Sequence, residues 1–172
     1  WLVDTGITFT GVSDCSIAWG DYDNDGDLDL VAAGHTGAMR VTTIYRNDGG
    51  TYTDIGAGLD GVSYGEVCWG DFDNDGDLDL ALAGQGLSYF NKIYRNDAGT
   101  FVDTGTVLPP LYQCSMAWGD YDNDGDLDLA QAGIAGGATT KIYRNDNGTF
   151  TDAGFDLTGF RYCSIAWGDY DN

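Results

Sequence analysis

The chain has 172 residues, of which 42% are hydrophobic and 13% aromatic, so it has enough apolar surface to fold around a core. Its 28 acidic residues outweigh 7 basic ones and give a formal net charge of −21. Such a field repels nucleic acid and anionic membrane surfaces, which excludes both as expected partners and makes divalent cations the natural counter-charge. No apolar run approaches the roughly 20 residues of a membrane span, so membrane insertion is not expected either.

An internal repeat is the strongest signal in the chain. The phrase WGD(Y/F)DNDGDLDL occurs three times in full and a fourth time as WGDYDN. A second phrase, IYRND(G/A/N)GT(Y/F), recurs between the copies of the first. The first phrase starts at four tryptophans, spaced 50, 49 and 49 residues apart: Trp19, Trp69, Trp118 and Trp167.

Four strands are expected within each repeat. In the first repeat they cover residues 15–20, 28–34, 42–47 and 51–55, in chain order. The turn at residues 48–50 is Asp-Gly-Gly, and a two-residue turn with positive φ of this kind favours a tight hairpin before the last strand. Glycine is common, with 27 residues, and no stretch resembles a helix of several turns. Four strands in about 49 residues are typical of one blade of a β-propeller.

We therefore predict an all-β propeller built from four-stranded antiparallel blades, of which this chain holds about three and a half. One blade cannot bury both of its faces, so blades must stack against neighbours. Either further repeats of the same chain or neighbouring protein chains would complete the ring. The expected units are the outermost strand of a preceding blade, three whole blades, and the first strand with a broken loop of a further blade: residues 1–9, 13–55, 63–104, 112–153 and 160–172.

The aspartate-rich segment after the first strand of each blade is a candidate metal loop. In the first copy, Asp21 to Asp29, carboxylates occupy positions 1, 3, 5, 7 and 9, and glycine at position 6 permits a sharp turn. Hard oxygen ligands at alternate positions of a tight loop are what Ca²⁺ requires. Position 7 is expected to contribute its backbone carbonyl, which leaves its side chain free. Without a cation, five carboxylates within nine residues would repel one another.

One Ca²⁺ is predicted for each complete loop, and the fourth copy is incomplete. The loop is not an EF-hand, because position 12 is Ala32, Leu82 or Gln131 instead of glutamate and the flanks are predicted strands. The role of the metal is structural, to clamp the connection between the first two strands of a blade. The candidate ligands are Asp21, Asp23, Asp25, Asp27, Asp29, Asp71, Asp73, Asp75, Asp77, Asp79, Asp120, Asp122, Asp124, Asp126, Asp128, Asp169 and Asp171.

The DxDxDGxxD loop at blade spacing resembles the FG-GAP/VCBS repeat family, which includes the repeats of integrin α-subunit propellers and of many secreted bacterial proteins. The likeness covers essentially the whole chain. It implies a calcium-binding, often seven-bladed propeller that is extracellular, secreted or at the cell surface. It also implies calcium loops on one rim and ligand sites in variable loops, and no motif here allows those ligand positions to be transferred.

The sequence favours a scaffold over an enzyme. It has one histidine, His35, one glutamate, Glu66, and no GxSxG, HExxH or Cys/His dyad. A structural or adhesion module, such as a cell-surface scaffold, adhesin or fibre subunit, is the preferred interpretation. The alternative is a lectin-like propeller that binds glycans, although the loops at 34–40, 84–90 and 133–139 do not repeat their side chains.

Several other residues carry smaller expectations. Three arginines of the YRND phrase are expected to pair with a nearby aspartate: Arg46, Arg95 and Arg144. The four cysteines are either buried free thiols or disulfide-bonded, and Cys68 should face away from the other three: Cys15, Cys114 and Cys163. Asn147 begins the sequon Asn-Gly-Thr in an exposed turn and is a candidate glycosylation site.

Overall fold

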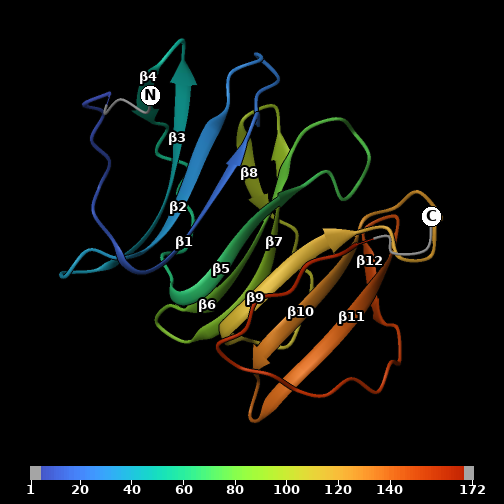
Figure 1. The fold of residues 1–172 in the computed structure, drawn as a ribbon. Coiled ribbons are helices and arrows are strands. Elements are labelled where there is room, and N and C mark those ends of the chain that lie inside the picture. Colours follow the sequence, from blue (N-terminus) through green and yellow to red (C-terminus); the bar gives the residue numbers. More distant parts are fainter. Residues whose placement is uncertain (1–4, 169–172) are drawn as a thin grey trace.

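The computed structural model describes residues 5–168. Twelve strands form three separate four-stranded antiparallel sheets, each with its strands in chain order, and Figure 1 shows the sheets side by side. Blade 1 consists of β1 (Ser13–Gly20), β2 (Asp29–His35), β3 (Arg40–Asp48) and β4 (Thr51–Asp54). Blade 2 consists of β5 (Ser63–Gly70), β6 (Asp79–Gln85), β7 (Tyr89–Asp97) and β8 (Thr100–Asp103). Blade 3 consists of β9 (Tyr112–Gly119), β10 (Asp128–Ile134), β11 (Ala138–Asp146) and β12 (Thr149–Asp152).

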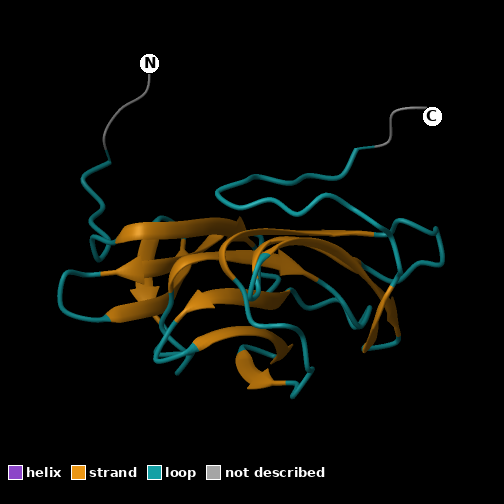
Figure 2. Ribbon diagram, turned by 90° about the horizontal axis from the view of Figure 1, so that it is seen from below, coloured by secondary structure: helices purple, strands orange, loops and turns teal. Residues whose placement is uncertain are grey.

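The predicted all-β fold is confirmed. The sheets form an open partial propeller of three blades, with the first strands β1, β5 and β9 adjacent to one another. Figure 2 shows strands and loops without any helix in the described part of the chain. Accordingly, residues 5–168 include no helix that is long and apolar enough to cross a membrane.

The local turns follow the expected backbone chemistry. In the hairpin between β3 and β4, Gly49 and Gly50 have φ of 59° and 92°, as a tight two-residue turn with right-handed strand twist requires. In blade 1, the first strand, β1, starts two residues earlier than expected. Its pairing with β2 contains a register shift between Ser13 and Ser16. Asp14, at that shift, has a φ of 48°. The shift is a β-bulge, which the alternating pattern did not indicate.

The core lies between blades, so each interior sheet is covered on both faces. Val31 and Ile44 of blade 1 pack with Val67 and Leu80 of blade 2 in one buried cluster. A second cluster joins blades 2 and 3, and includes Ile93 and Leu129 among others. This arrangement explains why β6 of the middle blade is buried over almost its whole length and shows no alternation of polar and apolar residues. In β2, Leu30 and Ala32 pack instead with Phe9 and Tyr52.

The repeated tryptophan and the aromatic at loop position 2 form the junction between blades. Tyr22 of blade 1 stacks on Trp69 of blade 2 with ring centroids 6.2 Å apart, and Phe101 of β8 lies 5.7 Å from Tyr22. A Cβ added to Gly20 would lie 2.7 Å from the Trp69 ring. Gly70 and Gly119 meet the next tryptophan in the same way, so these three glycines are needed for the next blade's indole to approach the backbone.

The ends differ from the sequence prediction. Residues 1–4 and 169–172 lie outside the described part, and residues 5–9 and 161–168 form no strand there. A strand needs a paired neighbour in its own sheet, and the described residues provide none at either end. Residues 160–168 nevertheless lie against blade 3 as a first strand would. Trp167 stacks on Tyr121 at 6.3 Å, and its Nε1 donates to the Ala117 carbonyl at 3.0 Å.

Candidate metal centres

Each complete aspartate loop connects the first and second strands of its blade and curls around its own carboxylates. In blade 1, both oxygens of Asp21 accept backbone hydrogen bonds, from Asp25 N and Gly26 N at 3.0 Å each. Asn24 and Gly26 have φ of 58° and 94°, which turns the loop back toward its start. The same backbone pattern recurs in the loops of blades 2 and 3.

The loops bring together the carboxylates at positions 1, 3 and 9. In each group, the candidate ligand oxygens all lie within 4.8 Å of one another, so each group could hold a metal ion. The groups are Asp21, Asp23 and Asp29 in blade 1, Asp71, Asp73 and Asp79 in blade 2, and Asp120, Asp122 and Asp128 in blade 3. Clustered carboxylate oxygens are a donor set that suits a hard cation.

The position-9 aspartate is the buried anchor of each site. Asp29, Asp79 and Asp128 are 0% exposed. In blade 2, Asp79 accepts hydrogen bonds from the backbone N–H groups of Phe72, at 3.0 Å, and Asn96, at 2.8 Å. Burial nevertheless outweighs these bonds and raises the pKa of Asp79 to about 7. Burial also raises the pKa of Asp29 and Asp128, so ionisation of all three anchors would be favoured by a cation beside them.

The position-3 carboxylates of blades 1 and 2 give a second indication that the loops suit a cation. Oδ1 of Asp23 and Oδ1 of Asp73 are buried without a hydrogen-bond partner. Burial raises the pKa of both groups, and the neighbouring position-5 and position-1 carboxylates raise it further. A buried carboxylate oxygen without a partner is costly, and a cation beside it would remove that cost. The residues present therefore fit a bound metal ion.

Positions 5 and 7 lie outside the three groups. In blade 1, Asp25 Oδ1 accepts a hydrogen bond from Asp27 N at 2.8 Å. The expectation that the position-7 side chain is free is wrong, because Asp27 Oδ2 accepts from Gly49 N at 2.7 Å. This bond ties the metal loop to the β3–β4 turn, which the linear spacing of the loop does not reveal. Asp169 and Asp171 of the fourth loop lie outside the described residues.

The asparagine of the YRND phrase is the site residue that the sequence analysis missed. Asn47 N donates to Asp29 Oδ1 at 2.8 Å, and Asn47 Nδ2 donates to the Leu28 carbonyl at 3.0 Å. Asn96 and Asn145 make the corresponding bonds in blades 2 and 3. The recurrence of asparagine at this position in every copy of the phrase could have identified it as a site residue from the sequence.

The arginines of the same phrase pair with the aspartate two residues later, as predicted. The shortest distances are 2.9 Å for Arg46 to Asp48 and 2.8 Å for Arg95 to Asp97, and Arg144 pairs with Asp146. These pairs are well exposed, so each contributes little to stability.

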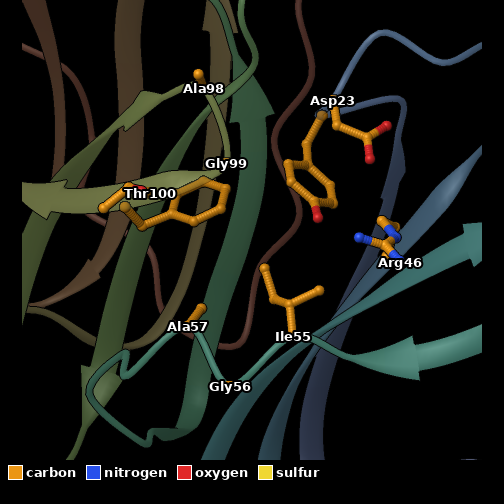
Figure 3. Close-up of a pocket in the computed structure, with 10 residues that line it drawn as sticks. Asp23, Arg46, Ile55, Gly56, Ala57, Ala98, Gly99 and Thr100 are labelled. Atoms are coloured by element: carbon orange, nitrogen blue, oxygen red, sulfur yellow. The ribbon is translucent and has the colours of Figure 1, made fainter.

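A hollow lies beside the first metal loop at the junction of blades 1 and 2. Figure 3 shows Asp23 and Arg46 on one side, Ile55 and the loop after β4 below, and the β7–β8 turn at Ala98 opposite. A second hollow at the next junction has the equivalent Asp73 and Arg95 in its lining. The hollow is therefore a repeated feature of the blade junction.

The remaining candidates occupy ordinary structural positions. All four cysteines are free thiols, and Cys15 is exposed whereas Cys114 is buried, so the expectation of uniformly buried thiols is wrong for Cys15. Burial raises the pKa of Cys114 to about 12, which makes this thiol unreactive. His35 Nδ1 accepts a hydrogen bond from Gly37 N at 3.0 Å. Asn147 is exposed in the β11–β12 turn, where the sequon was placed.

Comparison with known proteins agrees with this geometry. A family model described as FG-GAP-like repeat matches residues 21–82 and 71–130, so each match runs from one metal loop into the next blade. No curated protein matches the chain. Together the two matches cover well over half of the sequence, including all three complete aspartate loops.

Proposed function

The chain belongs to the FG-GAP-like repeat family, and from this premise we propose that it is a calcium-stabilised, extracellular β-propeller module with a structural or adhesive role and no catalysis. FG-GAP repeats occur in integrin-like extracellular β-propellers and are generally structural modules. We propose calcium binding, an extracellular location and an adhesive role for this chain in addition to its membership of the family.

The observation that carries the calcium proposal is the set of three equivalent carboxylate groups. Each combines a fully buried position-9 aspartate with two further carboxylates whose oxygens lie within 4.8 Å. The Oδ1 atoms of Asp23 and Asp73 are buried without a hydrogen-bond partner, and a bound cation would stabilise them. Ca²⁺ is favoured over Mg²⁺ because it accepts mono- and bidentate carboxylates in a flexible shell, whereas Mg²⁺ demands a near-ideal octahedron and sheds water reluctantly.

Calorimetric titration of the chelator-treated protein tests this proposal. We expect one calcium ion per complete loop and much weaker binding of magnesium. Asp23→Asn should remove or greatly weaken one site, because it removes the charge of one ligand, whereas the amide oxygen of asparagine can still accept the backbone hydrogen bond from Asp25. Asp156→Asn removes the same charge from an exposed residue outside the loops and is the matched control. Absence of calcium uptake by the unsubstituted chain would refute the proposal.

The scaffold role rests on the open face of blade 1, which displays the residues that form the internal junctions. Ile17 is 58% exposed, whereas the equivalent Val67 and Met116 are 1% and 4% exposed. Trp19 and Leu28 are also more than half exposed, at 51% and 57%. We propose that another blade of the same repeat type covers this face, either from further repeats or from a neighbouring chain.

A cross-linking experiment tests the identity of that partner. A photoreactive residue placed at Ile17 in the native protein should cross-link to a blade bearing the same aspartate loop. A product with a protein that lacks such a loop, or no product, would contradict this part of the proposal.

A glycan-binding propeller is the second candidate, and the repeated hollow at the blade junction favours it. The hollow combines an aromatic, a carboxylate and a guanidinium, in Tyr22, Asp23 and Arg46, and these types recur as Phe72, Asp73 and Arg95. A glycan array in calcium and in chelator distinguishes the two functions. Specific binding that Arg46→Ala and Arg95→Ala reduce supports the lectin, and absence of binding across the array supports the scaffold.

A further inference from the structure

The asparagine of the YRND phrase connects neighbouring metal loops as well as bracing its own. At the first junction, Asn96 Nδ2 donates to the backbone carbonyl of Tyr22 in blade 1 at 2.8 Å and to the Leu78 carbonyl of its own loop at 3.1 Å. Tyr22 is the residue whose N–H donates to Asp29 Oδ2 at 3.0 Å. Asn96 N donates to Asp79 Oδ1 at 2.8 Å. A continuous path therefore joins the anchor carboxylates of blades 1 and 2.

The second junction repeats the path residue by residue. Asn145 Nδ2 donates to the Phe72 carbonyl at 2.7 Å, and Asn145 N donates to Asp128 Oδ1 at 2.9 Å. Phe72 N in turn donates to Asp79 Oδ2 at 3.0 Å. Asn96 and Asn145 are 0% exposed, so water does not compete for these bonds. The three anchor carboxylates thus lie on one buried hydrogen-bonded line across both junctions.

A parallel, exposed connection runs between the loops themselves. Asn24, at position 4 of the first loop, donates from Nδ2 to Asp77 Oδ1 at 2.9 Å and to the Gly76 carbonyl at 3.2 Å. Asn74 makes the same pair of bonds to the third loop. These contacts join position 4 of one loop to positions 6 and 7 of the next.

We propose that Asn96 and Asn145 are positioning residues through which calcium binding in one blade raises the calcium affinity of the next. The inference rests on the proposed calcium function of the loops. A cation fixes the loop that presents the Tyr22 carbonyl, and this fixes Asn96, whose backbone N–H orients Asp79. The second loop then has less freedom to lose when it binds its own ion, which produces positive coupling.

A double-mutant cycle measures this coupling. Asp23→Asn weakens the first site, and we expect the mean calcium affinity of the other two loops to fall about fivefold or more, at the lower end of usual site-to-site coupling. When Asn96→Ala is also present, Asp23→Asn should change that affinity by less than about twofold, because the buried path is cut. Calorimetry on the full chain, with calcium alone as the probe, supplies both values.

Asn47→Ala is the matched control for Asn96→Ala. Asn47 makes the same bonds within its own blade, to Leu28 O and from Gly50 N, and donates to no other blade among the described residues. In the Asn47→Ala background, Asp23→Asn should still lower the affinity of the other loops about fivefold. Equal loss of coupling in the two backgrounds would mean that the asparagine acts only within its own loop, and would overturn the inference.

A second set of variants serves if Asn96→Ala fails to fold. The double variant Asn24→Gly with Asn74→Gly removes the exposed donors, and glycine suits the positive φ of 58° at both positions. Asn123→Gly is the control, because the Asn123 side chain donates to no following loop in the described part of the chain. We expect both the double variant and the control to change the coupling by less than about twofold, because the buried path through Asn96 and Asn145 stays intact. Loss of the coupling in the double variant alone would overturn its assignment to Asn96 and Asn145. Three ions bound independently in the unsubstituted chain would overturn the coupling and leave the calcium proposal standing. No uptake would overturn both.

Discussion

Equivalent residues of the repeat are packed at the junction of blades 1 and 2 but exposed on the outer face of blade 1. At the junction of blades 1 and 2, Val67 is 1% exposed and Trp69 stacks on Tyr22. On the outer face of blade 1, the equivalent Ile17 and Trp19 are 58% and 51% exposed. Since both blades form the same four-stranded sheet, burial of the tryptophan belongs to the contact between blades and is not needed to form the strand that carries it.

The largest expected effect is a difference in the free energy of unfolding between Trp69→Ala and Trp19→Ala. Trp69→Ala should lower the free energy of unfolding by about 3–5 kcal/mol, because it leaves a cavity against Tyr22 and Phe101. Trp19→Ala should cost under about 1 kcal/mol, because half of that side chain is already in water. Urea unfolding of both variants measures the difference. Equal losses would show that burial at the junction is not what distinguishes the two positions.

The glycine of the WGD phrase gives the next largest effect. A Cβ on Gly70 would lie 2.5 Å from the Trp118 ring, so Gly70→Ala should force the blades apart and cost about 1–3 kcal/mol. Gly168→Ala is the matched control, since a Cβ there meets nothing within 4 Å. Thermal unfolding in calcium compares the two variants. A neutral Gly70→Ala would mean that Trp118 has room to move.

Removal of calcium should weaken the junctions more than the outer face of blade 1. For an extracellular-type affinity and about 1 mM calcium, each loop should contribute about 0.4–1.4 kcal/mol to stability. Hydrogen exchange with and without chelator should therefore rise at the buried amides of Phe72 and Asn96. Amides near Ile17 serve as the internal reference. Unchanged exchange at Phe72 and Asn96 would contradict a clamping role for the metal.

The last prediction is a dependence of stability on pH, and its sign differs between the calcium-free and the calcium-bound protein. The folded pKa of Asp79 is raised to about 7, above that of an unfolded aspartate, so the calcium-free fold loses stability as pH rises from about 4 to about 7. Calcium requires the ionised carboxylate, so its affinity should rise over the same interval. Melting temperatures with and without calcium at pH 5 and pH 7.5 check both trends. Parallel trends would contradict the assignment of Asp79 as a ligand.

The local elements of the fold were predictable because each repeat carries complete short-range information. The turn glycines at 49 and 50 agree with the structure, and the expected bounds of the four strands in the first repeat agree to within two residues. The carboxylates at positions 1, 3 and 9 were also predicted, since a nine-residue loop with a central glycine brings them together over a short stretch of chain. The register shift at Asp14 was missed, because the repeat and turn signals that predicted the strand do not reveal an extra residue within it.

The sequence by itself determined that the chain is a series of four-stranded blades with an aspartate-rich loop in each, because turns, strands and loop spacing depend on residues close along the chain. Only the tertiary structure decided which copies of an identical phrase are buried, that Asp27 braces the β3–β4 turn, and that Asn96 reaches Tyr22 in another blade. These contacts depend on how two sheets face each other, and Asn96 and Tyr22 are 74 residues apart. No local pattern encodes such a distance, whereas packing between blades fixes it.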